Sequence, residues 1–165
     1  MRENKKKSKE LKFKHVVILS IGIGFFLWFM VGHLRISITP SDGYRVFWIK
    51  NECNYEKGEF VMFKVAPDDP YVPDPERFYL IKRIVCMPGE KIERKGLAFY
   101  CNGFEIGKAV TKTRDGKPLK PWEPKVEVIP EDMFFVAGSH PRSYDSKYFG
   151  LVHKKQIEKC LTPLF

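Results

Sequence analysis

An uncharged stretch near the N-terminus constrains this chain more than any other feature. From Val16 to Gly32 the sequence reads VVILSIGIGFFLWFMVG, and the next charged residue is Arg35. A helix of about 17–25 apolar residues spans a bilayer. This stretch is apolar all round, whereas the core helix of a globular domain carries a single apolar stripe. We therefore expect a transmembrane helix over residues 15–34.

The flanking charge predicts how that helix is oriented. Residues 1–14 carry seven basic and two acidic side chains, which is +5 of the chain's net charge of +9. The positive-inside rule places this basic tail in the cytoplasm, and residues 35–165 on the periplasmic side of the inner (cytoplasmic) membrane. A cleaved signal peptide also starts basic, but its apolar region is shorter and ends at a small-residue cleavage site. A nucleic-acid binder is disfavoured, because the tail and the folded domain lie on opposite sides of the membrane.

Residues 35–165 indicate one mostly β domain. Sustained 3.6-residue periodicity is absent, and short apolar runs alternate with proline and glycine turn signals. Asn102-Gly103 between two such runs predicts a tight hairpin, and the proline-rich stretches 67–77 and 112–124 are expected as surface loops. We expect a largely antiparallel fold, and residues 154–159 allow a short helix. The expected strands are 44–50, 60–65, 78–86, 91–93, 97–101, 104–110, 126–129, 133–138 and 150–152.

The cysteines, Cys53, Cys86, Cys101 and Cys160, are spaced in no metal-ligand pattern. An exported domain can oxidise its cysteines. Cys86 and Cys101 flank an expected strand–turn–strand and are the favoured disulfide, with buried free thiols as the alternative. Since no metal-ligand set stands out, neither a metal nor another cofactor is expected.

Three segments hold residue types suited to nucleophilic catalysis. Ser37 lies just past the expected membrane helix, in Ser37-Ile38-Thr39-Pro40, where a linker serine is the alternative interpretation. Lys82 and Arg83 interrupt an apolar strand, and strand neighbours point to opposite faces. A lysine on the apolar face has a lowered pKa and can act as a general base, whereas two exposed charges would only protect a sheet edge.

The third segment is the polar run GSHPRSYDSKYFG at residues 138–150, which forms either a hydrogen-bonded cluster or a solvated loop. In this order, the segments resemble those of the signal peptidase I superfamily. The matching motifs are S-I-T-P (37–40), K-G-E-F-V-M-F (57–63), K-R-I-V-C-M-P-G-E (82–90) and the polar run itself. The chain looks most like the TraF-type conjugative-transfer peptidases, which share Gly43-Tyr44 and a loop similar to residues 114–121.

The resemblance implies a signal-peptidase-type β domain behind one membrane anchor. It also implies a Ser/Lys serine endopeptidase that matures a pilin or another exported precursor protein. Ser37 matches the nucleophile and Lys82 the general base. Ser143 matches a serine that orients the lysine, while Asp145 and Lys147 match a structural Asp–Arg pair.

The chain also departs from the family pattern. Lys147 replaces an arginine and cannot reproduce bidentate pairing. Ser139 stands where an aspartate is common. Arg35 occupies the position of a hydroxyl oxyanion donor, so the oxyanion hole is expected to rest on backbone N–H groups, including that of Ser37.

Several alternatives stay open. Thr39 is a second candidate nucleophile, and Ser37, His140 and Asp145 have the residue types of a Ser-His-Asp triad. A housekeeping signal peptidase would share the dyad, and a non-enzymatic pilus or secretion assembly factor would share the anchor and the β domain. Phe47, Trp48 and residues 60–63 either dip into membrane lipid or belong to the core.

Overall fold

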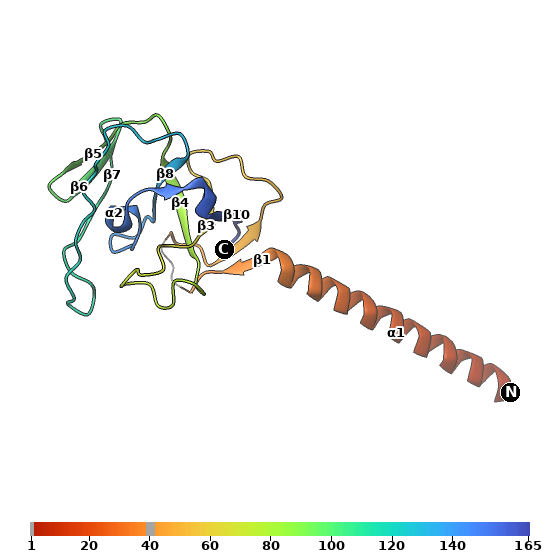
Figure 1. Cartoon of the computed structure of the whole chain (residues 1–165). Helices are drawn as coiled ribbons and strands as arrows, with labels where there is room; N and C mark the ends of the chain where they lie inside the picture. Colours follow the sequence, from red (N-terminus) through yellow and green to blue (C-terminus); the bar gives the residue numbers. More distant parts are fainter. Residues whose placement is uncertain (1, 39–41) are drawn as a thin grey trace. The chain divides into compact units, whose positions relative to one another are not determined.

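The computed structural model describes residues 2–38 and 42–165, in two units that meet between Arg35 and Ile36. The N-terminal unit is dominated by helix α1 (Arg2–His33; Figure 1). Within α1, the 21 residues Phe13–His33 have a mean hydropathy of 2.1 and are long and apolar enough to cross a membrane. The predicted apolar helix is therefore confirmed. It ends at His33, because Leu34 opens a strand, and α1 also includes most of the basic tail.

The larger sheet has seven strands in the order β1-β2-β10-β3-β4-β8-β9. They are β1 (Leu34–Ile36), β2 (Val46–Ile49), β3 (Phe60–Phe63), β4 (Leu80–Cys86), β8 (Met133–Ala137), β9 (Val152–His153) and β10 (Ile157–Pro163). The pairings of β10 with β2 and β3, of β4 with β3 and β8, and of β8 with β9 are antiparallel. The mostly β, antiparallel prediction is confirmed.

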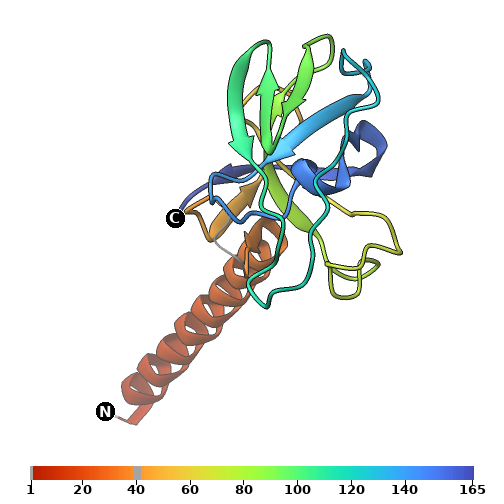
Figure 2. The ribbon, with the colours of Figure 1, turned by 90° about the vertical axis from the view of Figure 1, so that its left-hand side faces the viewer.

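A smaller antiparallel sheet lies at one end of the domain (Figure 2). It contains β5 (Ile92–Lys95), β6 (Ala98–Cys101) and β7 (Phe104–Lys108). Asn102 and Gly103 connect β6 to β7 with φ angles of 49° and 83°, as a tight turn requires. The predicted hairpin is confirmed at the residues that signalled it.

The structure corrects three local predictions. Residues 154–159 are not a helix beyond a short 3₁₀ turn (Lys154–Gln156), and the chain continues as β10 between β2 and β3. Residues 126–129 form no strand; the segment makes an isolated bridge between Lys91 and Val128, and the carbonyl of Ile129 accepts from the N–H of Gly89 at 2.9 Å. The polar run contains a four-residue helix, α2 (Ser146–Phe149), with Asp145 as its N-cap.

The core lies on both faces of the central strands, since all residues of β3 are buried. Phe47, Phe60 and Met62 lie in a buried cluster with Ile49 and Leu161. Phe47 and residues 60–63 are therefore core, and the interpretation that they dip into lipid is wrong. Trp48 is half-buried, and its contact with lipid stays a prediction.

Two disulfides cross-link the domain, and they account for all four cysteines of the chain. Cys86 at the end of β4 bonds to Cys101 at the end of β6, with Cα atoms 5.8 Å apart, which ties the two sheets together. Cys53 bonds to Cys160 in β10 across 107 residues. The favoured Cys86–Cys101 bridge is confirmed, and the second bridge was not predicted.

Candidate active site

Strand β4 places Lys82 in the protein interior. Burial alternates along the strand: Lys82 is 4% exposed, while the neighbouring Arg83 side chain is 40% exposed. Lys82 is paired in register with Val61 of β3, whose side chain is fully buried. The prediction that one of the two adjacent cations faces the apolar side is confirmed, and that cation is the lysine.

The Lys82 ammonium has a buried polar partner. Its Nζ donates a hydrogen bond to Ser143 Oγ at 3.0 Å, and Ser143 is 4% exposed. Burial lowers the pKa of Lys82 from 10.5 to about 8, and the nearby Lys147 ammonium adds to the lowering. The Asp145 and Asp42 carboxylates oppose it by favouring the charged form. A large share of Lys82 is therefore neutral, and able to accept a proton, close to pH 8.

The polar run 138–150 is a hydrogen-bonded cluster. Lys147 Nζ and Asp145 Oδ2 form a buried ion pair at 2.7 Å. The same oxygen accepts from the backbone N–H of Gly138, and Asp145 Oδ1 accepts from that of Lys147, both at 3.1 Å. Ser146 Oγ accepts from the N–H of Val136 in β8 at 2.9 Å. These hydrogen bonds hold residues 138–150 against β8, which lies beside β4 in the sheet.

Asp42 is a part of this region that sequence reasoning missed. Its Oδ1 accepts from the backbone N–H of Ser139 at 2.8 Å and lies 3.6 Å from Nη2 of Arg83. Only 5% of the Asp42 side chain is exposed. No motif marks Asp42 in the sequence, where it stands two residues after S-I-T-P in a turn-rich segment. Ser139 therefore contributes its main chain where the family commonly has an aspartate side chain.

Ser37 is half-buried and lies directly after β1. Its backbone N–H donates to the carbonyl of Arg45 at 2.8 Å, which holds it alongside the segment that enters β2. This N–H is thus engaged, which corrects the expectation that it serves the oxyanion hole. Arg35 directs its guanidinium to the carbonyl of Leu34 at 2.8 Å. The alternative nucleophile Thr39 lies outside the described residues.

The structure disfavours the Ser-His-Asp alternative. His140 is exposed, and its Nδ1 accepts from the backbone N–H of Arg142 at 3.1 Å. Both oxygens of Asp145 are engaged by Gly138 and Lys147. Asp145 therefore stabilises the cluster around Lys82 and, within the described part of the chain, forms its hydrogen bonds there and not with the His140 imidazole.

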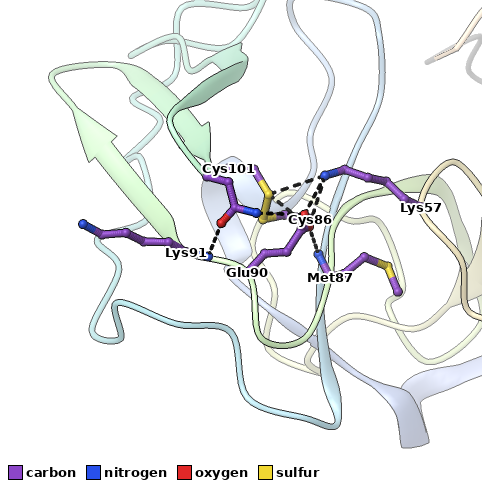
Figure 3. The surroundings of a disulfide bond; sticks show 7 residues. Lys57, Cys86, Met87, Glu90, Lys91 and Cys101 are labelled. Carbon is purple, nitrogen blue, oxygen red and sulfur yellow. Dashed lines mark hydrogen bonds and ion pairs between the residues drawn. A yellow bond between two sulfur atoms is a disulfide. The ribbon is translucent and has the colours of Figure 1, made fainter.

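Cys86, Glu90 and Cys101 bring three potential metal-ligand atoms within 4.8 Å of one another. The two sulfur atoms are joined in the disulfide, so neither is a thiolate that could bind a metal (Figure 3). Glu90 instead pairs with Lys57 at 2.9 Å and accepts from the backbone N–H of Met87 at 2.7 Å. These contacts with Lys57 and Met87 lower the pKa of Glu90, although its partial burial acts in the opposite direction. This group is a cross-link between the sheets, reinforced by an ion pair.

Comparisons with known proteins bear on this arrangement. A family model described as "Signal peptidase, peptidase S26" matches residues 10–160, which include all three candidate segments. Signal peptidase IB of Staphylococcus aureus (strain Mu50) is 31% identical over 169 residues, covering 85% of this chain and 83% of that protein. Signal peptidase I of Bacillus amyloliquefaciens is 27% identical, covering 86% and 77%. A crystal structure of a signal peptidase I from Enterococcus faecalis is 24% identical with a TM-score of 0.43, covering 69% of this chain and 99% of that one.

Proposed function

This chain belongs to the peptidase S26 family of signal peptidases, which are serine endopeptidases, and we propose that Ser37 and Lys82 are its nucleophile and general base. The single observation that carries the proposal is the buried Lys82, with a pKa of about 8 and its Nζ held by Ser143 Oγ at 3.0 Å. A lysine with an ordinary pKa of about 10.4 would be almost fully protonated at neutral pH and could not serve as a base.

The chemistry then follows a Ser/Lys route. Neutral Lys82 takes the hydroxyl proton of Ser37, and the serine oxygen attacks the scissile carbonyl carbon. The tetrahedral adduct collapses to an acyl-enzyme as Lys82 protonates the departing amine. The Lys82 amine, neutral again, then deprotonates a water molecule, which hydrolyses the ester and regenerates Ser37. Ser143 orients the amine, and the Asp145–Lys147 ion pair stabilises the segment that carries Ser143.

The substrates are exported precursor proteins, cut after small residues at the outer face of the membrane. The helix Phe13–His33 anchors the enzyme, with the basic tail in the cytoplasm and the catalytic domain outside it. Two disulfides support this orientation, since disulfides persist in oxidising compartments. The curated relatives are named as signal peptidases, which favours a broad range of signal-bearing precursors.

A narrower substrate, a pilin precursor of a conjugative-transfer system, is the second candidate. Gly43-Tyr44 and the loop at residues 114–121 favour it, because both resemble features of the TraF-type peptidases. Cleavage of the pilin precursor together with rejection of general signal-bearing precursors would support this candidate.

The test compares the full chain in membranes with Ser37→Ala and Lys82→Met, using a signal-bearing precursor and a pilin precursor as probes. Lys82→Met preserves the length of the side chain without its amine. The controls are Ser20→Ala in the membrane helix and Lys91→Met, whose ammonium is exposed and pairs with Glu93. Loss of processing in the first two variants and retention in the controls would support the dyad. Processing by Ser37→Ala or Lys82→Met at the wild-type rate would overturn it.

A further inference from the structure

Aromatic side chains surround Tyr144, the residue between Ser143 and Asp145. The ring of Tyr144 lies 5.3 Å from that of Tyr71 and stacks on that of Tyr148 at 5.4 Å with an interplanar angle of 12°. It also meets Phe149 edge-on at 5.6 Å. Tyr144 is therefore packed against three aromatic rings, a contact that the sequence analysis did not predict.

The hydroxyl of Tyr144 has one specific partner. It donates to Asp69 Oδ2 at 2.8 Å across 75 residues of sequence. Asp69 is itself fixed, because its Oδ1 accepts from the backbone N–H groups of Tyr71 and Val72 at 2.9 and 3.0 Å. Val72 lies in the hydrophobic core. Asp69 is thus a rigid acceptor, even though it belongs to a proline-rich surface loop.

The second proline-rich loop reaches the same cluster. Tyr71 Oη donates to the carbonyl of Pro118 at 2.5 Å, and Tyr148 Oη accepts from the N–H of Val110 at 2.8 Å. Burial, together with the Asp69 carboxylate, raises the pKa of Tyr144, so its hydroxyl stays protonated and remains a donor. Both loops therefore contribute to holding Tyr144 in one position.

The three consecutive residues 143–145 thus each make a separate side-chain contact. The side chain of Ser143 meets Lys82, that of Tyr144 meets Asp69, and that of Asp145 meets Lys147. Because Ser143 precedes Tyr144 directly in the chain, fixing the Tyr144 side chain restricts the backbone that carries Ser143 Oγ. We propose that Tyr144, held by Asp69, is a positioning residue that fixes the Ser143 hydroxyl against the Lys82 amine.

This inference rests on the proposed Ser/Lys function and adds a consequence for the base. If Tyr144 loses its hydrogen bond, Ser143 holds Lys82 less well and water gains access to the amine. Burial is the largest cause of the lowered pKa of Lys82, so hydration moves that pKa back toward its ordinary value. A residue that merely stabilises the fold would lower the amount of active enzyme without moving this pKa.

The experiment uses the full chain in detergent micelles and a precursor protein with a signal sequence as the probe. Tyr144→Phe removes only the hydroxyl. We expect kcat to fall by about tenfold, the scale of one lost buried hydrogen bond, with KM unchanged. The acid limb of the pH profile is expected to move to higher pH. Tyr79→Phe is the matched control, because Tyr79 Oη also donates to a carboxylate, Glu158, at 3.0 Å on the exposed surface.

A second variant keeps the test decisive if Tyr144→Phe folds poorly. Asp69→Asn retains Oδ1 as the acceptor for the two loop N–H groups while replacing the charged acceptor of Tyr144. It is expected to move the pH profile in the same direction by a smaller amount. An unmoved profile in both variants would overturn the inference, whatever their total activity. Failure of the proposed function looks different, since Ser37→Ala and Lys82→Met would then retain wild-type activity.

Discussion

Lys82 Nζ and Ser143 Oγ lie 3.0 Å apart in a hydrogen bond that joins β4 to the polar run after β8. Both side chains are buried, so the lysine has lost most of its contact with water, and the Ser143 hydroxyl is among the groups that it meets instead. A hydroxyl accepts a hydrogen bond from the ammonium but adds no negative charge to stabilise it. Ser143 can therefore orient the amine while leaving its pKa low enough for base chemistry.

The pH dependence of processing follows from this relationship. Only neutral Lys82 accepts a proton, so kcat/KM is expected to rise with pH and level off above about pH 8. Ser143→Ala is expected to lower the plateau by about tenfold, because the amine loses its orienting partner. Ser139→Ala, an exposed hydroxyl in the same run, serves as the control. An acid limb near pH 6–7 that disappears in His140→Ala would contradict the lysine base and restore the histidine alternative.

Because the Lys82 amine is buried, we expect it to destabilise the folded state. The pKa of Lys82 is about 8 in the folded chain and 10.5 in the unfolded chain, so the unfolded state binds more protons between these values. Wild-type stability should therefore rise as the pH increases from about 8 to 10.5, and the full penalty should be present below pH 8. Lys82→Met is expected to stabilise the folded state at pH 7 by about 1–3 kcal/mol, after allowing for the lost bond to Ser143.

Thermal unfolding of the full chain in detergent, at pH 7 and pH 10, checks this prediction. The melting temperature of Lys82→Met should exceed that of the wild type at pH 7, and the difference should shrink at pH 10. Lys91→Met, at an exposed position, should show no such pH-dependent gain. A Lys82→Met protein that melts below the wild type at pH 7 would show that burial of this amine costs little.

Sequence patterns predicted the features that depend on neighbouring residues. Alternation along residues 78–86 predicted that one of Lys82 and Arg83 is buried, and Asn102-Gly103 located a hairpin. Strand β10 was missed because residues 154–159 are good helix formers in isolation. Pairing with β2 and β3, and the bond from Cys160 to Cys53, override that propensity.

The missed parts of the site depend on contacts between residues far apart in sequence. Asp42 meets Ser139 across 97 residues, and Asp69 meets Tyr144 across 75. Neither acid stands in a pattern that marks it, since both occur in turn-rich segments where aspartate is common. Resemblance supplied Ser143, Asp145 and Lys147, but it gave no indication of what holds them in place.

The buried ion pair of Asp145 and Lys147 predicts a large effect from a single change. Lys147→Met leaves the fully buried Asp145 carboxylate without its cation, and such a loss costs about 3–5 kcal/mol of stability. Replacing both partners, as in Asp145→Asn with Lys147→Met, should recover part of that loss. Lys91→Met breaks the exposed pair with Glu93, which solvent screens, and should cost far less stability than Lys147→Met. Denaturant unfolding of the three proteins gives the comparison, and equal losses for Lys147→Met and Lys91→Met would contradict it.

The two disulfides should differ in how much they stabilise the domain. A bridge restricts the unfolded chain more when it closes a longer loop, with about 3 kcal/mol expected for 15 residues and about 4.7 for 100. The separations here are 15 for Cys86–Cys101 and 107 for Cys53–Cys160. Replacing Cys53 and Cys160 together by alanine should therefore lower the free energy of unfolding more than the same change at Cys86 and Cys101. Denaturant unfolding of the full chain measures both, and a larger loss for the Cys86–Cys101 pair would show that its link between the sheets outweighs loop entropy.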